Sequence, residues 1–189
     1  NLIKLGIEVT LVERLSQVTP GLDEDMAIYV QEHLIKNKVH VITSGNVVAI
    51  KDNKVLLEDG RAINAELVLI SAGEKPNTNL AVKDGVKRGI TKSIKVNKKM
   101  MTNVPDIFAC GDCIEEYNLV TGKPIYRPLG STANKTGRIA GDAITGGDLE
   151  FRGILGTGIF KIFHMTVAQT GLSEREARSE GYDVVTCHN

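Results

Sequence analysis

The chain has 189 residues, of which 42% are hydrophobic, and it carries 23 basic and 23 acidic residues. This length and composition predict a globular protein, and a net charge of zero argues against the basic field that binds nucleic acid or anionic lipid. No apolar run approaches the roughly 20 residues of a membrane span, and an odd number of cysteines, three, argues against a secreted disulfide framework. We therefore expect a cytoplasmic protein without nucleic-acid or membrane partners.

The N-terminal part predicts a helix end, a strand and a second helix. The opening NLIKLG is typical of a last helical turn, with Gly6 as its left-handed cap. The β-rich run IEVTLVE closes on Glu13, as the second strand of a dinucleotide-binding unit does. Apolar residues at helical spacing follow the acidic start LDED, and we expect this helix to end at Asn37.

Short β runs dominate from residue 39 to residue 71. VHVITS, NVVAI, KVLLE and ELVLIS are separated by the turn sequences KDNK and EDG, which predicts a β-meander returning to a buried strand at residues 66–71. Gly73 is then expected on the loop at the carboxyl end of that strand. Open α/β sheets bind their ligands at this edge.

The second half predicts two further β runs, around GIT to IKVN and in DIFACGD, followed by a helix of small residues, STANKTGRIAGDAITGG. A new strand is expected in LGTGIFKIF. The glycines of GILGTG are in the wrong order for a phosphate-binding loop, so we interpret them as sites of tight strand packing. SEREARSEG predicts a solvated helix with i,i+4 ion pairs.

The segment VPDIFACGDC ends in a C-x-x-C sequence, which fits a redox dithiol, half of a metal site, or a Gly-Asp turn in which sulfur takes no part. A single C-x-x-C does not complete a zinc site, and no ligand spacing relates the four histidines, so no metal is expected. The apolar run IFA predicts that Cys110 is buried in a strand. A buried thiol is a poor nucleophile, which favours the Gly-Asp turn.

Four segments, in this order, resemble the flavin-dependent pyridine nucleotide-disulfide oxidoreductases, and the branch that contains coenzyme A-disulfide reductase, NADH oxidase and NADH peroxidase in particular. They are LGIEVTLVER, LVLISAGEKPNT, TNVPDIFACGDC with RPLGSTANKTGRIAGDAI, and GILGTGIFKIFHMTVAQTGLSE. The resemblance implies an α/β fold of incomplete Rossmann-like FAD- and NAD-binding domains with a β-meander. Residues 1–80 would be the C-terminal part of the NAD(P)-binding domain, 81–148 the C-terminal part of the FAD-binding domain, and 149–189 the start of an α/β dimerisation domain.

The resemblance also implies cofactor-binding residues. Asp112 would accept hydrogen bonds from the ribityl hydroxyls of FAD, and donors at the start of the following helix would face the pyrimidine edge of the flavin. The expected FAD set is Gly111, Asp112, Leu129, Gly130, Ser131, Thr132 and Ala133, and the expected NAD(P)H set is Glu13, Arg14 and Gly73. The alternatives are a simple strand-to-turn Gly-Asp, an ordinary capped helix, and a solvated Glu13–Arg14 pair.

The family's two Gly-rich loops and its redox cysteine precede the part that this chain matches. We therefore expect a fragment of a homodimeric flavoenzyme, with no catalytic residue in this chain. The implied activity transfers hydride from NAD(P)H to FAD and then reduces a disulfide, a peroxide or oxygen. The alternatives are an NADH oxidase and, in another class, an electron-transfer flavoprotein that serves a protein partner.

Overall fold

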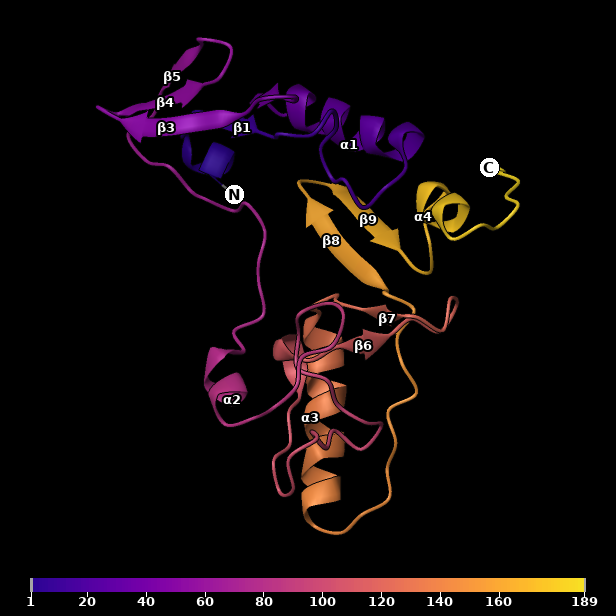
Figure 1. Cartoon of the computed structure of the whole chain (residues 1–189). Helices are drawn as coiled ribbons and strands as arrows, with labels where there is room; N and C mark the ends of the chain where they lie inside the picture. The colour runs from indigo at the N-terminus through magenta and orange to yellow at the C-terminus, as the bar shows by residue number, and fades with distance from the viewer. Residues whose placement is uncertain (1, 189) are drawn as a thin grey trace. The chain divides into compact units, whose positions relative to one another are not determined.

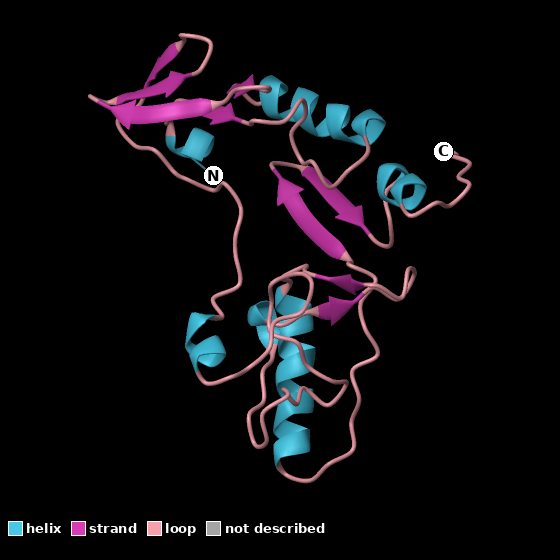
Figure 2. Cartoon of the chain, in the orientation of Figure 1, coloured by secondary structure: helices cyan, strands magenta, loops and turns pink. Residues whose placement is uncertain are grey.

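The computed structural model describes residues 2–188, which form two compact units that are considered separately (Figures 1 and 2). Among the described residues, unit 1 comprises 2–72, 159–168 and 173–188, and unit 2 comprises 73–158 and 169–172. Helices and short sheets occur in both units, so the chain is an α/β protein, as predicted.

Unit 1 begins as the sequence predicts. A 3-10 helix, η1 (Leu2–Leu5), ends at Gly6, whose φ of 77° is the left-handed conformation expected of a cap. Strand β1 (Val9–Val12) pairs in parallel with β2 (Val39–Ile42). Helix α1 (Glu24–Lys36) connects them, with Glu24 and Asp25 in its first turn, and Asn37 is its C-cap.

The β-meander is also confirmed. Strands β3 (Val47–Lys51), β4 (Lys54–Leu57) and β5 (Ala62–Asn64) form an antiparallel sheet in sequence order. Val55 and Leu57 of β4 pack with Ile42 of β2 in a buried core. Unit 1 also contains most of the paired strands β8 (Gly158–Ile162) and β9 (Met165–Gln169), and helix α4 (Glu174–Ser179). In α4 the predicted i,i+4 pair joins Arg178 to Glu174, with Nε and Oε1 2.7 Å apart.

The prediction of a buried strand at residues 66–71 is wrong for this chain. Hydrogen bonding to the meander ends where the Ala65 N–H donates to the Asn53 carbonyl, and no strand among residues 2–188 pairs with the segment that follows. Leu67, Leu69 and Ile70 are 82%, 83% and 72% exposed. A parallel strand needs neighbours for its backbone N–H and C=O groups, and without them the segment stays extended and unpaired.

Unit 2 contains helix α2 (Asn79–Lys83), the 3-10 turn η2 (Gly111–Cys113), the short hairpin β6 (Glu116–Tyr117) with β7 (Pro124–Ile125), and helix α3 (Gly130–Ile144). The β runs expected at GIT–IKVN and DIFACGD form only isolated bridges, which pair Ile94 with Arg88 and Ile114, and Met101 with Phe108. The core of unit 2 consists of Val86, Ile94, Val96, Met100, Ile114 and Ala140.

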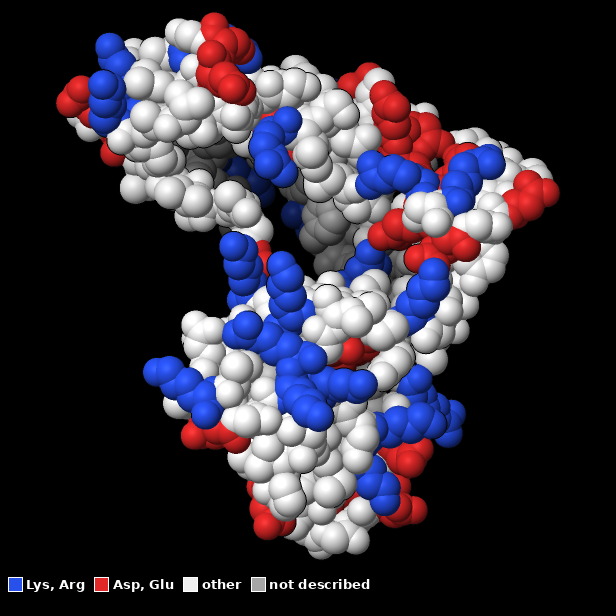
Figure 3. Space-filling model, viewed as in Figure 1, with Lys and Arg blue, Asp and Glu red and all other residues white. Residues whose placement is uncertain are grey.

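The tight packing predicted for the glycines of GILGTG is found at Gly153 and not at Gly158, where an added Cβ would meet no atom of the described residues within 4 Å. A Cβ at Gly153 would lie 2.6 Å from the Tyr117 carbonyl oxygen, and the Ile154 N–H donates to that carbonyl at 2.8 Å. Side chains of both signs lie on the visible surface (Figure 3), in keeping with the zero net charge. Within residues 2–188, no helix combines the length and apolarity needed to cross a bilayer.

Candidate functional site

The Gly111–Asp112 turn follows an extended residue and reverses the chain. Cys110 has a φ of −150° and a ψ of 169°, and Gly111 then adopts a φ of 76°, which glycine tolerates at little cost. Ile114, 1% exposed, anchors the far end of the turn in the core. On either side of it, the Cys113 carbonyl accepts from the Ile94 N–H and the Glu115 N–H donates to the Ile94 carbonyl, both at 2.8 Å.

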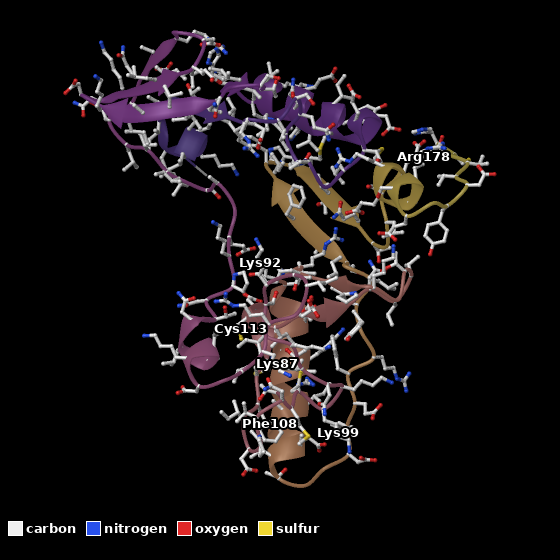
Figure 4. The ribbon with its side chains drawn as sticks, in the orientation of Figure 1. Lys87, Lys92, Lys99, Phe108, Cys113 and Arg178 are labelled. Carbon is white, nitrogen blue, oxygen red and sulfur yellow. The ribbon has the colours of Figure 1, made fainter. Side chains whose placement is uncertain are left out.

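Helix α3 presents its N-terminus to this turn. A Cβ built on Gly111 would lie 3.7 Å from Cβ of Ala133 in the first turn of the helix, and Cys113, labelled in Figure 4, belongs to the turn that contacts α3. The N-cap Leu129 supplies no side-chain cap, and its carbonyl accepts from the N–H groups of Thr132 and Ala133 at 2.9 Å each. Those two N–H groups are used within the helix, so the backbone donors that the start of α3 offers are the N–H groups of Gly130 and Ser131, at the positive end of the helix dipole.

Thr136 ties the turn to the helix. Its Oγ1 accepts from the Gly111 N–H at 3.0 Å and donates to the Thr132 carbonyl at 2.9 Å, and the residue is fully buried. Sequence reasoning did not select Thr136. The signal available was the four-residue spacing of Thr132, Thr136 and Ala140, the three buried residues of α3.

The predicted FAD residues are thus brought together. Gly111 and Asp112 lie on the turn, Leu129 to Ala133 form the start of the helix against it, and the side chains of Asp112 and Ser131 are exposed. This geometry fits a cofactor that carries hydroxyls and a negatively polarised edge. Hydroxyls can donate to the Asp112 carboxylate, and the edge can accept from the backbone N–H groups at the start of α3.

Two acids close to Asp112 were missed by the sequence analysis. Burial, and secondarily the charge of Asp112, raise the pKa of Glu116 to about 7. Burial, and then the charges of Glu74 and Asp112, raise the pKa of the Tyr126 phenol. Both lie on the β6–β7 side of the turn, where local sequence gives no sign of their proximity to residue 112.

The expected burial of Cys110 is wrong, because Cys110 is exposed. The strand predicted to contain Cys110 forms only an isolated bridge, at Phe108. Among the described residues, no neighbouring strand therefore pairs with the backbone at Cys110. Cys113 is half-buried, its thiol donates to the Cys110 carbonyl at 3.3 Å, and burial raises its pKa. A raised thiol pKa lowers the thiolate fraction, which disfavours a redox dithiol. No group of three metal-ligating side chains occurs in the described part of the chain.

The predicted NAD(P)H residues are divided between the two units, and each is described within its own unit. Glu13 follows β1 in unit 1, where its carboxylate accepts from the Leu15 N–H at 2.8 Å and its carbonyl accepts from the Gly45 N–H at 2.9 Å. Arg14 is exposed. Gly73 opens unit 2 as an exposed loop residue with a φ of 93°.

The sheet and meander of unit 1 and the turn and helix of unit 2 define an α/β protein, and unit 2 holds a candidate cofactor site at a helix N-terminus. The pyridine nucleotide-disulphide oxidoreductase family matches residues 1–127. The chain belongs to this family.

Individual relatives agree with this assignment. The CoA-dependent NAD(P)H sulfur oxidoreductase of Pyrococcus furiosus is 40% identical over 96% of this chain. The NADH oxidase of Methanocaldococcus jannaschii is 34% identical over 95%, and a coenzyme A disulfide reductase of Staphylococcus aureus is 30% identical over 98%. The chain spans 42%, 41% and 42% of the lengths of these relatives.

A solved structure of an NAD-dependent persulfide reductase from A. fulgidus matches with a TM-score of 0.93 and 41% identity. The match covers 96% of this chain and 35% of that chain. The arrangement of elements in the described chain is therefore also found in an experimental structure of a named reductase.

Proposed function

We propose that the whole protein is an FAD-dependent NAD(P)H oxidoreductase that reduces a small disulfide or persulfide, with coenzyme A disulfide as the preferred candidate. The Gly111–Asp112 turn, held against the uncapped start of α3, carries the proposal. The names of the relatives from Pyrococcus furiosus and Staphylococcus aureus support a substrate that contains coenzyme A.

The residues of this chain fit FAD in three ways. The Asp112 carboxylate accepts from ribityl hydroxyls, Gly111 leaves room for the cofactor beside the backbone, and the N–H groups at the start of α3 stabilise negative charge on the flavin. When bound, FAD supplies the chemistry of accepting hydride from NAD(P)H. Thr136 keeps the turn and the helix in register.

We further propose the domain division given by the resemblance: residues 1–80 in the NAD(P)-binding domain, 81–148 in the FAD-binding domain and 149–189 in the dimerisation domain of a cytoplasmic homodimer. In the NAD(P)-binding part, Glu13 accepts from the adenine-ribose hydroxyls and Gly73 leaves space on the nicotinamide side. The three cysteines are free thiols, which supports a reducing compartment.

The test compares Asp112→Ala with Asp84→Ala in the whole protein. Loss of a charged hydrogen bond costs roughly 1.5–3 kcal/mol, so Asp112→Ala should weaken flavin binding by about one to two orders of magnitude. Asp84, an exposed C-cap of α2, is the matched control and should bind flavin normally when replaced. Wild-type flavin affinity in Asp112→Ala contradicts the proposed site.

The acceptor is tested by following NADH oxidation with coenzyme A disulfide, a persulfide, hydrogen peroxide and oxygen in turn. The highest kcat/KM is expected with coenzyme A disulfide or the persulfide. If oxygen is reduced fastest, the protein is an NADH oxidase, the activity named for its Methanocaldococcus jannaschii relative.

A further inference from the structure

Glu116 has a buried carboxyl group that none of the roles above uses. It lies on β6 opposite Ile125 of β7, and the residue is only 5% exposed. Its Oε2 is buried without a hydrogen-bond partner among the described residues. Leaving a buried polar atom unpaired costs free energy, so nearly all such atoms in folded proteins have a partner.

The neighbouring residue shows that burial alone does not leave a carboxyl unpaired here. Glu115 is 4% exposed, and its Oε2 accepts from both the N–H and the Oγ1 of Thr91, each at 2.9 Å. Two consecutive buried carboxyls therefore differ in one respect, because Glu115 is satisfied within the protein and Oε2 of Glu116 is not.

The groups that face Glu116 are mostly acids. The charge of Asp112 on η2 acts on Glu116 directly, and Tyr126, which follows β7, responds electrostatically to Asp112, Cys113 and Glu116. Arg127 bonds to the Glu116 carboxyl through its backbone, while its Nη1 donates to the Gly156 carbonyl at 3.4 Å. Burial, and after it the charge of Asp112, favours the neutral form of this acid and raises the pKa of Glu116 to about 7.

We propose that Glu116 is a second carboxyl of the cofactor site, a neutral acid whose Oε2–H donates to a hydroxyl of the polyol chain of the bound flavin beside Asp112. Asp112, when ionised, is only an acceptor, whereas a protonated Glu116 adds a donor. Each hydroxyl of such a chain can both donate and accept a hydrogen bond. Asp112 as the acceptor and Glu116 as the donor would therefore orient the chain together. This inference rests on the proposed flavin site.

The experiment measures the dissociation constant of FAD for the whole apoprotein by fluorescence titration between pH 6 and pH 8. Because only the protonated acid donates, wild-type affinity should fall roughly tenfold over this range. In Glu116→Gln the amide donates at every pH, so affinity at pH 6 should stay within a few-fold of wild type and the pH dependence should disappear. Unit 2 contains no histidine that would titrate here.

Glu115→Gln is the matched control, since Glu115 is equally buried but paired with Thr91, and it should keep the wild-type pH dependence. A Glu116→Gln variant that follows the wild-type curve overturns the inference. A wild-type affinity that is constant from pH 6 to pH 8 also overturns it, and this measurement does not depend on whether the variant folds.

The failure of this inference is distinguishable from failure of the proposed function. If Asp112→Ala loses flavin while Glu116→Gln follows the wild-type curve, the flavin site stands and the role of Glu116 is wrong. If Asp112→Ala binds flavin as wild type does, the proposed site itself is wrong, and with it the role of Glu116.

Discussion

Replacing Thr136 by valine should loosen the Gly111–Asp112 turn without changing the shape of the core. Valine has nearly the volume of threonine but lacks Oγ1, which accepts from the half-buried Gly111 N–H at 3.0 Å, and Thr136 itself is fully buried. The Gly111 N–H then loses its partner. A buried donor left unsatisfied costs roughly 1–3 kcal/mol, so about 2 kcal/mol is expected for the local opening of the turn.

Hydrogen exchange of peptides that span residues 110–115 in the whole protein is the appropriate assay, because it reports local opening. A loss of about 2 kcal/mol corresponds to roughly thirtyfold faster exchange. Thr136→Ser restores the hydroxyl and should restore most of the protection. Thr145→Val is the matched control, since the exposed Thr145 hydroxyl bonds only to the Gly141 and Asp142 carbonyls at the other end of α3.

Unchanged exchange in Thr136→Val would refute the reasoning, because the hydrogen bond to Gly111 would then contribute nothing to the turn. Equal acceleration in Thr136→Val and Thr145→Val would assign the effect to the helix as a whole. Flavin affinity should weaken in Thr136→Val and not in Thr145→Val, since only the first displaces residues of the candidate site.

Replacing Cys110 and Cys113 together by alanine should leave turnover within a few-fold and flavin bound, and loss of turnover with flavin retained would make the C-x-x-C a redox centre. Glu13→Ala should lower the NADH over NADPH ratio of kcat/KM about tenfold or more, because a charged contact worth roughly 1.5–3 kcal/mol is removed; an unchanged ratio would leave Glu13 as a solvated carboxylate. The folded-state pKa of Glu116 is raised from 4.5 to about 7, so this carboxyl destabilises the apoprotein progressively as pH rises from 4.5 through 7. Glu116→Gln should therefore gain about 3 kcal/mol relative to wild type between pH 4.5 and pH 8 in urea unfolding, and a pH-independent difference would contradict the shift.

Local pattern predicted much of unit 1. The acidic start and the apolar spacing of α1 predicted a helix that ends at Asn37, and the structure has one at Glu24–Lys36. The buried side chains of this helix, however, are Ala27 and Val30, while Met26 and Tyr29 are 49% and 60% exposed. The spacing of apolar residues along the sequence predicts that a helix forms. Which face of that helix is buried depends on the elements that pack against it.

In unit 2, the sequence by itself determined that a Gly-Asp turn and a helix of small residues are present, because glycine conformation and helix propensity act over a few neighbouring residues. Only the tertiary structure decided that Thr136 bonds to Gly111 across 25 residues, that Cys110 is exposed, and that Glu116 is buried near Asp112. It also decided that residues 66–71 remain unpaired. Each of these outcomes depends on partners distant in sequence, whose hydrogen bonds and burial no local pattern encodes.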